Sequence, residues 1–351
     1  MSHADPREPK AAAPVWTEER GACDERRGKT GAQGRPEASG KAEPQGRPEA
    51  SGKAERTKIG FIGLGIMGAP MAANRVKAGV AVTGYNRSPA KVEQLVAAGG
   101  RGAGSIAEAV RDADMVATMV PDSPDVQEVL AGQDGVFENA RSGALIIDFS
   151  SIRPDVAAAL AAEGGKRGFR MLDAPVSGGE AGAVEGVLSI MVGGDAGDFE
   201  AAGPVFDAVG KTVVHVGPAG SGQTVKAANQ LMVAGHLELL AEAIVFLEAY
   251  GVDTEAALRV LGGGLAGSTV IQRKGPNMLA RDFKPGFRIA LHDKDMGIVT
   301  AAAREAGVVI PLGAAVAQLV ASLKAQGDGG LDHSALLKLV AQLSGRQERQ
   351  E

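Results

Sequence analysis

The most constraining feature of this sequence is a glycine triad that directly follows a short apolar run. In KIGFIGLGIMGAPMAANRVKAG, Gly63, Gly65 and Gly68 form the pattern G-x-G-x-x-G between a predicted strand and a predicted helix. Glycines at these spacings permit a tight turn, close approach of a pyrophosphate to backbone N–H groups, and tight packing of the helix on the strand. A second predicted strand ends about 20 residues later, as the motif requires. The residues expected to bind a dinucleotide in this loop are Gly63, Leu64, Gly65, Ile66, Met67 and Gly68.

Short apolar runs alternate with helical stretches from Thr57 to about residue 220. Strands are predicted at 58–63, 81–86, 115–120, 144–150, 170–177 and 188–194, and helices after Gly65, Pro89, Ser123 and Pro154. This alternation is typical of a Rossmann-type α/β fold, with a doubly wound and mostly parallel sheet. After residue 220 the pattern is helical and begins with a helix of about 29 residues, or about 43 Å. The sequence therefore predicts an α/β domain over 57–220 and an all-α domain over 221–345.

Residues 1–56 precede this pattern and are rich in Pro, Gly, Ala and charges of both signs. The segment GRPEASGKAE occurs at 34–43 and again at 46–55. Such a composition cannot bury enough apolar surface to offset the entropy lost on ordering, so we expect a disordered tail. A partner-binding or targeting arm, a dispensable extension and a start codon placed too early are the alternatives.

Composition excludes several classes of function. The formal net charge of -5 gives no support for non-specific nucleic-acid binding. The single cysteine, Cys23, can supply neither a disulfide framework nor a thiolate metal site. No run of about 18 apolar residues lacks charges, and the amino terminus holds no apolar core for a signal peptide. We therefore expect a cytoplasmic protein with no membrane or nucleic-acid partner. We also expect no metal site, because the histidines that follow the tail are scattered at His215, His236, His292 and His333.

The end of the second predicted strand, Tyr85-Asn86-Arg87-Ser88, bears on the choice of dinucleotide. An NAD enzyme normally carries an acid here, which holds both ribose hydroxyls. Asn86 removes the carboxylate that would repel a 2′-phosphate, and Arg87 supplies a planar fork able to bind one. NADP(H) is therefore favoured over NAD(H), and Asn86, Arg87 and Ser88 are expected to contact it. Arg87 as an ordinary solvated turn residue is the alternative.

Two further segments carry polar groups suited to chemistry. Lys226, Asn229 and Gln230 share one face of a long helix that is apolar most of the way round, so a buried lysine there needs a reason. Ser177-Gly178-Gly179 ends a predicted strand, where open α/β sheets bind ligands, and offers a hydroxyl and backbone N–H groups to a carboxylate. A lysine that reaches solvent from a helix end and a turn without a ligand are the alternatives.

Five segments, taken in order and spacing, resemble the β-hydroxyacid dehydrogenase family. They are FIGLGIMGAPMAAN, DAPVSGGEAGAVEGVLSIMVGG, GSGQTVKAANQ, GGLAGSTV and FKPGFRIALHDKD, and the likeness extends from Lys58 to about Leu343. Within this family, VKAANQ, GGLAGSTV, FKPGFRI and DHSAL are most similar to the branch that reduces tartronate semialdehyde. Many family members have Asn where this chain has Gln230, but that branch shares the Gln. Asn86-Arg87 is less typical of the branch than an acid, and Ala290 replaces an expected acid.

The resemblance implies roles for individual residues. It places the catalytic lysine at Lys226 and its partner amides at Asn229 and Gln230. It places substrate-carboxylate contacts at Ser177, Gly178 and Gly179. Positions near the nicotinamide and the substrate fall on Ser151, Phe287, Lys294 and Asp295, although Phe287 could simply be a core aromatic. The family fold also implies that the all-α domain takes part in substrate binding and builds homodimers or homotetramers.

These implications lead to a hypothesis about function. We expect NADPH-dependent reduction of tartronate semialdehyde to D-glycerate by hydride transfer, with Lys226 as general acid, because an ammonium stabilises charge that develops on the carbonyl oxygen. Other small carboxylated aldehydes or hydroxyacids are the nearest alternatives: 3-hydroxyisobutyrate oxidation, or glyoxylate or succinic semialdehyde reduction. An alternative of another class is a non-catalytic dinucleotide-binding protein.

Overall fold

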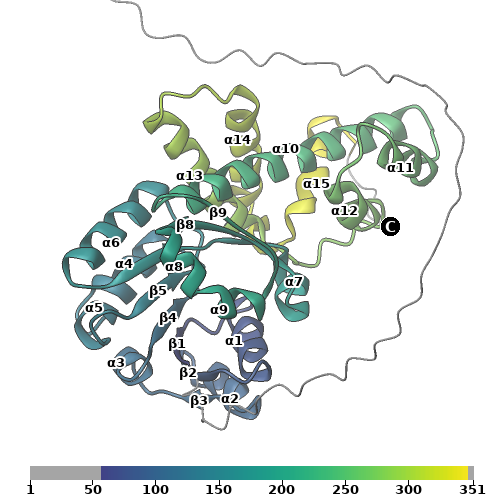
Figure 1. Ribbon diagram of the computed structural model, residues 1–351. Coiled ribbons are helices and arrows are strands. Elements are labelled where there is room, and N and C mark those ends of the chain that lie inside the picture. Colours follow the sequence, from purple (N-terminus) through teal and green to yellow (C-terminus); the bar gives the residue numbers. More distant parts are fainter. Residues whose placement is uncertain (1–56, 347–351) are drawn as a thin grey trace, which may run out of the picture. The chain divides into compact units, whose positions relative to one another are not determined.

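The structure of the protein is a computed structural model that describes residues 57–346. The predicted tail over 1–56 lies outside the described residues. In the described part of the chain, an α/β region with one twisted sheet is followed by a region built of helices (Figure 1). The predicted fold class, a Rossmann-type and mostly parallel sheet followed by an all-α region, is confirmed.

The α/β region is organised around a nine-stranded sheet in the order β3-β2-β1-β4-β5-β6-β8-β7, with β9 also paired to β8. The strands are β1 (Lys58–Ile62), β2 (Ala81–Tyr85), β3 (Arg101–Gly102), β4 (Met115–Thr118), β5 (Leu145–Asp148), β6 (Arg170–Asp173), β7 (Val176–Ser177), β8 (Leu188–Gly194) and β9 (Gly210–Gly217). All neighbouring pairs from β3 to β6 are parallel, whereas β8 runs antiparallel to β6 and β7. The winding of the sheet reverses between β1 and β4, and ligands bind at the carboxyl ends of strands beside such a reversal.

The predicted strand over 170–177 is wrong as a single element. The structure has two strands there, β6 and β7, because Pro175 interrupts the ladder between them and cannot donate a backbone hydrogen bond. The Pro175 carbonyl still accepts from Met191 N at 3.1 Å, which keeps the break next to β8. As a result Ser177 ends a short separate strand that faces Ser189 of β8.

Both faces of the sheet are covered, which explains why its strands are almost wholly apolar. In β5, Leu145 and Ile147 belong to one apolar cluster and Ile146 to another on the opposite face. The first cluster is covered by α1 (Gly68–Lys77), α2 (Pro89–Ala97), α7 (Gly179–Glu185) and α9 (Gly203–Asp207), with α8 (Ala196–Ala201) beside it. The second is covered by α3 (Ile106–Val110), α4 (Ser123–Ala131), α5 (Val136–Asn139) and α6 (Pro154–Lys166).

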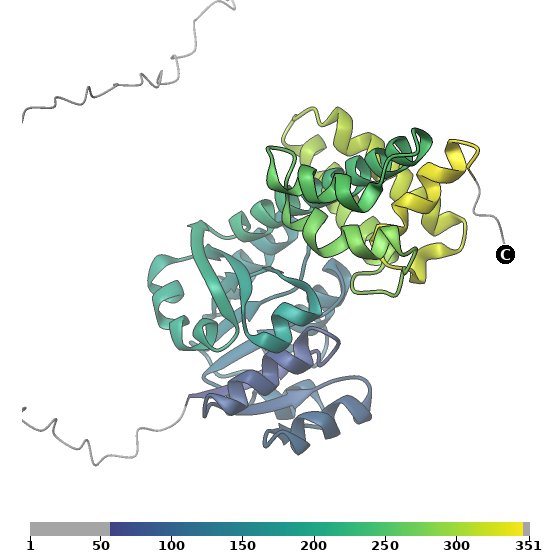
Figure 2. The ribbon, with the colours of Figure 1, turned by 90° about the vertical axis from the view of Figure 1, so that its right-hand side faces the viewer.

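The helical region begins with α10 (Ser221–Ala249), a helix of 29 residues. The helices that follow are α11 (Thr254–Gly263), α12 (Thr269–Leu279), α13 (Ile289–Glu305), α14 (Pro311–Ala325) and α15 (Leu336–Leu343), with short 3-10 turns η1 (Asp328–Gly330) and η2 (His333–Ala335). α10 packs against α12, α13, α14 and α15, and its first turns also pack against β8 and β9 (Figures 1 and 2). This helix therefore joins the helical core to the edge of the sheet where the site residues lie.

α10 is also the one helix in residues 57–346 whose length and apolar composition would suffice to cross a membrane. A central core helix has the same composition, and the inward face of α10 belongs to the apolar core of the helical region, through Leu237, Ala241 and Ile244. Its composition is therefore explained by packing within this fold.

Candidate active site

The glycine loop lies at the switch point between β1 and β4. Gly63 has φ +95°, and a Cβ there would collide with the Met119 carbonyl oxygen. A Cβ on Gly68 would collide with the Gly63 carbonyl oxygen, so both positions need glycine for close packing. A Cβ on Gly65, by contrast, would meet nothing within 4 Å, so the loop backbone is open to a ligand at this point.

The other loop residues lead into the N-terminus of helix α1. Leu64 is fully buried, whereas Ile66 is half-exposed, and Met67 caps the helix that Gly68 begins. Anions bind at such a helix N-terminus because its backbone N–H groups point outward. The tight glycines, the open Gly65 and the helix start together fit the pyrophosphate of a dinucleotide.

Asn86, Arg87 and Ser88 follow β2 at the same edge of the sheet. The Leu64 backbone N–H donates to Asn86 Oδ1 at 3.0 Å, so Asn86 ties the end of β2 to the glycine loop. Ser88 immediately precedes α2, and Arg87 projects with 83% of its side chain exposed, 3.7 Å from Asp125. Arg87 lies on the rim of a groove of about 560 Å³ that is also lined by α2 and Gly104. An exposed guanidinium with such a distant partner is free to bind an anion instead.

The turn Ser177-Gly178-Gly179 joins β7 to α7. Gly178 has φ +140° and Gly179 φ +67°, conformations that residues with a side chain rarely adopt. A Cβ on Gly179 would meet nothing within 4 Å, which leaves that backbone accessible. Arg273 of α12 donates to the Gly178 carbonyl at 3.5 Å, so the helical region reaches across to this turn.

Lys226 lies within hydrogen-bond distance of the strand that carries this turn. Its Nζ donates to the Val176 carbonyl at 2.8 Å and to Gln230 Oε1 at 3.1 Å, and its side chain is buried. Asn229 Nδ2 also donates to Gln230 Oε1, at 2.8 Å. The three polar residues of α10 therefore form one cluster beside Ser177 rather than a solvated helix face.

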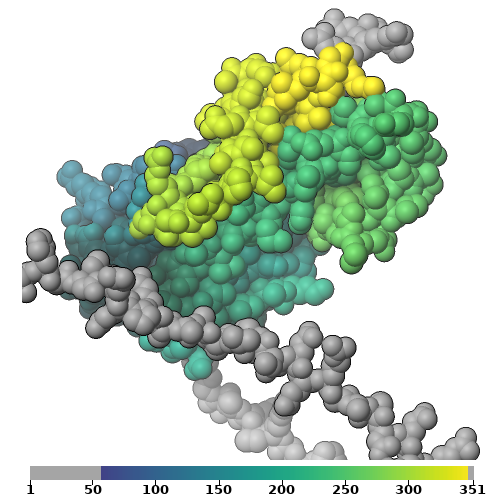
Figure 3. All heavy atoms as spheres, turned by 90° about the horizontal axis from the view of Figure 1, so that it is seen from above, coloured from purple at the N-terminus to yellow at the C-terminus, as the bar shows by residue number. Residues whose placement is uncertain are grey.

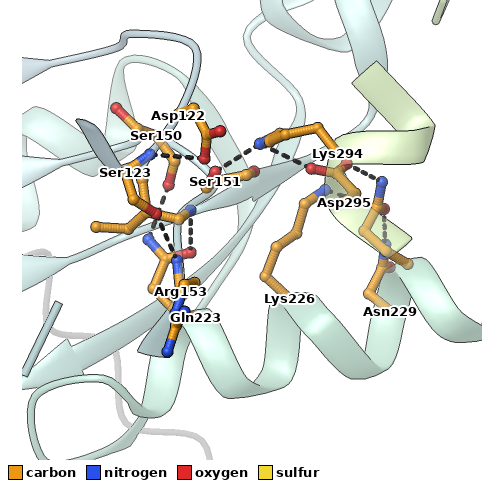
Figure 4. A network of polar contacts seen from close by, with 12 residues as sticks. Asp122, Ser123, Ser150, Ser151, Arg153, Gln223, Lys226, Asn229, Lys294 and Asp295 are labelled. Atoms are coloured by element: carbon orange, nitrogen blue, oxygen red, sulfur yellow. Dashed lines mark hydrogen bonds and ion pairs between the residues drawn. The ribbon is translucent and has the colours of Figure 1, made fainter. Parts of the chain in front are cut away.

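Helix α13 closes the cluster from the other side (Figure 4). Gln230 Nε2 donates to Asp295 Oδ2 at 2.5 Å, and Lys294 Nζ lies 2.8 Å from Asp295 Oδ1. The same Lys294 ammonium donates to the Ser151 carbonyl at 2.6 Å, beyond the end of β5. The chain of contacts thus runs from the sheet edge through α13 to Lys226.

The electrostatics of the cluster favour proton transfer near neutral pH. Burial lowers the pKa of the Lys226 ammonium to about 8, while the Asp295 carboxylate opposes this effect and Lys294 adds to it. A lysine with such a pKa can exist in both protonation states under physiological conditions. That property suits a general acid or base and is not needed for a lysine that only fills space.

Phe287 is placed by a buried carboxylate of the helical region. Asp332 Oδ2 accepts from the backbone N–H of both Gly286 and Phe287 at 2.9 Å. The Phe287 ring lies 5.8 Å from that of His292, which is one helical turn before Asp295, and 5.3 Å from that of His333. The structure therefore places Phe287 beside the cluster through a neighbouring ring rather than by direct contact with Lys226.

The predicted site residues fall into two groups along one edge of the sheet. The glycine loop and Asn86-Arg87-Ser88 lie at β1 and β2, and the cluster around Lys226 lies beyond β5.

Sequence reasoning missed two buried residues that connect α10 to the sheet, Asp173 and Gln223. Asp173 accepts from Gly220 N at 2.7 Å and from Gln223 N at 2.9 Å, so it anchors the start of α10. A signal was present, because Gln223 lies one turn before Lys226 on the same face.

Comparison with known proteins identifies the chain at the level of its family. Residues 58–217 match the NAD binding domain of 6-phosphogluconate dehydrogenase, and residues 220–340 match the NAD-binding domain of NADP-dependent 3-hydroxyisobutyrate dehydrogenase. The 2-hydroxy-3-oxopropionate reductase of Escherichia coli (strain K12) is 41% identical over 281 residues, which are 80% of this chain and 96% of that protein.

Two further similarities show how varied the substrates of these relatives are. An NAD-dependent L-serine dehydrogenase of Pseudomonas aeruginosa is 36% identical over 82% of this chain and 99% of that protein. The structure of Mycobacterium tuberculosis 3-hydroxyisobutyrate dehydrogenase with L-serine superposes with a TM-score of 0.75 at 35% identity, covering 81% of this chain and 99% of that one. The chain therefore belongs to the β-hydroxyacid dehydrogenase family, the 3-hydroxyisobutyrate dehydrogenase-like NAD(P)-dependent oxidoreductases.

Proposed function

We propose that this enzyme reduces tartronate semialdehyde (2-hydroxy-3-oxopropanoate) to D-glycerate with NADPH. The observation that carries the chemistry is Lys226, a buried lysine whose pKa burial lowers to about 8, bonded to the carbonyl next to Ser177. The choice of substrate rests on the 41% identity to a 2-hydroxy-3-oxopropionate reductase and on the segments shared with that branch.

In this proposal Lys226 is the general acid. When bound, the cofactor would supply a hydride to the substrate carbonyl carbon, and negative charge would develop on the carbonyl oxygen. The Lys226 ammonium stabilises that charge and donates its proton to the oxygen, effects that contribute roughly 10² to 10⁴ in rate. Gln230 fixes the lysine, and Asp295 holds Gln230 in turn.

The remaining side chains orient the two reactants. Ser177, Gly178 and Gly179 would hold the substrate carboxylate through a hydroxyl and backbone N–H groups. Lys294, which bonds the Ser151 carbonyl, would hold the loop after β5 beside the nicotinamide. The loop from Gly63 to Gly68 would bind the pyrophosphate, and Phe287 would border the substrate.

Turnover of candidate substrates tests this proposal. Oxidation of NADPH would be followed by absorbance with tartronate semialdehyde, glyoxylate, succinic semialdehyde and methylmalonate semialdehyde, and reduction of NADP⁺ with 3-hydroxyisobutyrate and L-serine. We expect the highest kcat/KM with tartronate semialdehyde. A higher value with methylmalonate semialdehyde or with L-serine would assign the enzyme to one of the other activities found among its relatives.

The Arg87→Ala substitution tests the preference for NADPH. Arg87 is expected to bind the 2′-phosphate, and a hydrogen bond between charged groups contributes about 1.5–3 kcal/mol. The variant should therefore bind NADPH about tenfold or more weakly while its affinity for NADH changes little, as measured by titration of cofactor fluorescence. The control is Arg259→Ala, which removes an exposed arginine of α11 whose ion-pair partner within residues 57–346 is Glu255. An equal loss for both cofactors would refute the 2′-phosphate role.

We also propose a homodimer or homotetramer that covers one face of α10. Val225, Met232, Leu239 and Phe246 recur every seven residues and are 38%, 61%, 61% and 61% exposed. α10 crosses the upper part of Figure 1, and Figure 3 shows the molecule from above. A heptad spacing of apolar residues suits packing against the same helix of a second copy.

Sedimentation velocity tests whether this apolar face of α10 forms the interface between copies. Met232→Glu combined with Leu239→Glu should convert the assembly to a smaller species, because two carboxylates would be buried without partners. Val260→Glu is the matched control, since Val260 is 76% exposed on α11 and lies outside the stripe. Unchanged sedimentation of the double variant would exclude this face as the interface.

A further inference from the structure

Gln223 of α10 has a buried side-chain amide. Its donor and its acceptor both hydrogen-bond to the backbone of one loop. Its Oε1 accepts from the Ile152 backbone N–H at 3.1 Å, and its Nε2 donates to the Ser150 carbonyl at 2.8 Å. The residue is 1% exposed and lies one helical turn before Lys226. Only an amide of this length satisfies both backbone groups, because a carboxylate lacks the donor and a thioether lacks a strong donor and acceptor.

The loop that Gln223 holds is also connected to the sheet and to α13. Ser150 N donates to Asp148 Oδ1 at 3.0 Å, and Ser150 Oγ accepts from Val120 N at 3.0 Å. The next residue, Ser151, offers its carbonyl to Lys294. The position of Lys294 therefore depends on a loop whose contact with α10 is made by Gln223.

These contacts form a closed ring that begins and ends on α10 (Figure 4). From Gln223 the ring passes through residues 150–152 to Lys294 and Asp295, and returns through Gln230 to Lys226. α10 itself closes it, since Gln223, Lys226 and Gln230 are spaced by three and four residues on one face. A break at Gln223 would free the loop and, through Lys294 and Asp295, loosen the groups that fix the lysine.

We propose that Gln223 is a positioning residue that holds the loop at 150–152 and Lys226 in one fixed geometry. The proposal rests on the proposed role of Lys226 as general acid. Gln223 does not touch the reacting atoms, and it acts through the ring. Misplacement of a catalytic group by about 1 Å can cost about 10² in rate. Loss of the two hydrogen bonds from Gln223 to the loop therefore has a large kinetic effect.

The Gln223→Met variant tests the proposal, because methionine has a similar length but neither hydrogen-bonding group. We expect kcat to fall about 10²-fold, whereas KM for the aldehyde changes less than threefold because the turn at Ser177 is intact. The pH at which kcat falls to half should also move upward, because water that enters beside the freed loop lessens the burial of Lys226. The charged groups that face this lysine, Asp295 and Lys294, both come from α13, and the substitution neither adds a charge nor removes one.

Two controls separate positioning from a general loss of stability. Leu240→Ala removes buried volume from the same helix away from the ring, and we expect it to lower the melting temperature while kcat stays within twofold. If Gln223→Met does not fold, Gln223→Leu takes its place, since leucine also lacks both hydrogen-bonding groups and adds no charge near Lys226. The same fall in kcat and the same upward shift are then expected.

The outcomes distinguish this inference from the proposed function. A Gln223 variant with wild-type kcat and wild-type pH dependence would overturn the positioning role while Lys226→Ala remains inactive. A fall in kcat with an unchanged pH midpoint would also overturn it, because the lysine environment would then be independent of the ring. If Lys226→Ala itself keeps normal turnover, the general-acid role fails first and the positioning role fails with it.

Discussion

Lys226→Ala is expected to lower kcat by about 10² to 10⁴ while NADPH still binds. Alanine removes the only group of α10 that bonds the Val176 carbonyl beside Ser177, and with it the proton donor for the substrate oxygen. The glycine loop that would bind the cofactor lies at β1, away from this substitution. Steady-state turnover and fluorescence titration with NADPH measure the two effects separately. Lys211→Ala, at an exposed lysine of β9, is the matched control.

The pH dependence gives a second measure of the same lysine. Burial lowers the pKa of Lys226 to about 8, so the ammonium predominates below that pH and the neutral amine above it. Aldehyde reduction needs the ammonium and should slow as pH rises through about 8, whereas oxidation of the hydroxyacid needs the neutral amine and should accelerate over the same range. Flat profiles between pH 6 and 10 in both directions, or near-normal turnover by Lys226→Ala, would refute the role.

The fold was predictable because several local signals agreed with one another. The glycine triad, the apolar run before it and the spacing to Asn86 all belong to one supersecondary unit, and such consistency specifies a structure. The strand break at Pro175 was missed because the flanking residues are apolar on both sides and resemble one continuous buried strand. The direction of β8 could not be predicted, since periodicity does not distinguish parallel from antiparallel pairing.

The site was predictable in its polar residues but not in its connections. Lys226 and Gln230 are close in sequence on a helix, so their contact follows from helical geometry. The contact of Gln230 with Asp295, and that of Lys294 with the Ser151 carbonyl, join segments far apart in the chain and depend on how α13 packs. Asp173 went unnoticed because it binds backbone groups of a distant segment, which leaves no pattern in a sequence. Gln223 also binds backbone groups, and its place one turn before Lys226 was the one signal that could have found it.

Replacement of Arg75 by an apolar residue is expected to increase stability. Arg75 lies on the inward face of α1 and is fully buried, and its Nη1 donates to the Met71 carbonyl at 3.0 Å. Its Nε and Nη2 atoms have no hydrogen-bond partner within residues 57–346. Burial lowers the pKa of the guanidinium to about 9, so the group is still a cation at neutral pH, but keeping its charge costs free energy that the unfolded chain does not bear.

Two opposing effects decide the sign of this prediction. The guanidinium lies 5.4 Å from the ring centre of Phe61 and 4.9 Å from that of Phe149, and each cation–π contact contributes about 0.5–2 kcal/mol. Each unpaired buried donor costs about 1–3 kcal/mol, and more when it is charged. Desolvation of the charge adds to that cost, and hydrophobic replacement of buried ionic groups can stabilise proteins by about 1–4 kcal/mol. The unfavourable effects therefore outweigh the two ring contacts.

Arg75→Met should accordingly raise the free energy of unfolding by about 1–4 kcal/mol, because methionine is unbranched, fills an irregular apolar space and packs well on aromatic rings. Chemical denaturation at pH 7 measures the change, with Arg111→Met at an exposed position as the control. The gain should stay constant near neutral pH and shrink as pH rises above about 9, because the wild-type guanidinium there loses its proton in the folded state but keeps it in the unfolded one. Destabilisation by Arg75→Met at pH 7 would instead mean that the ring contacts exceed the cost of the unpaired charge.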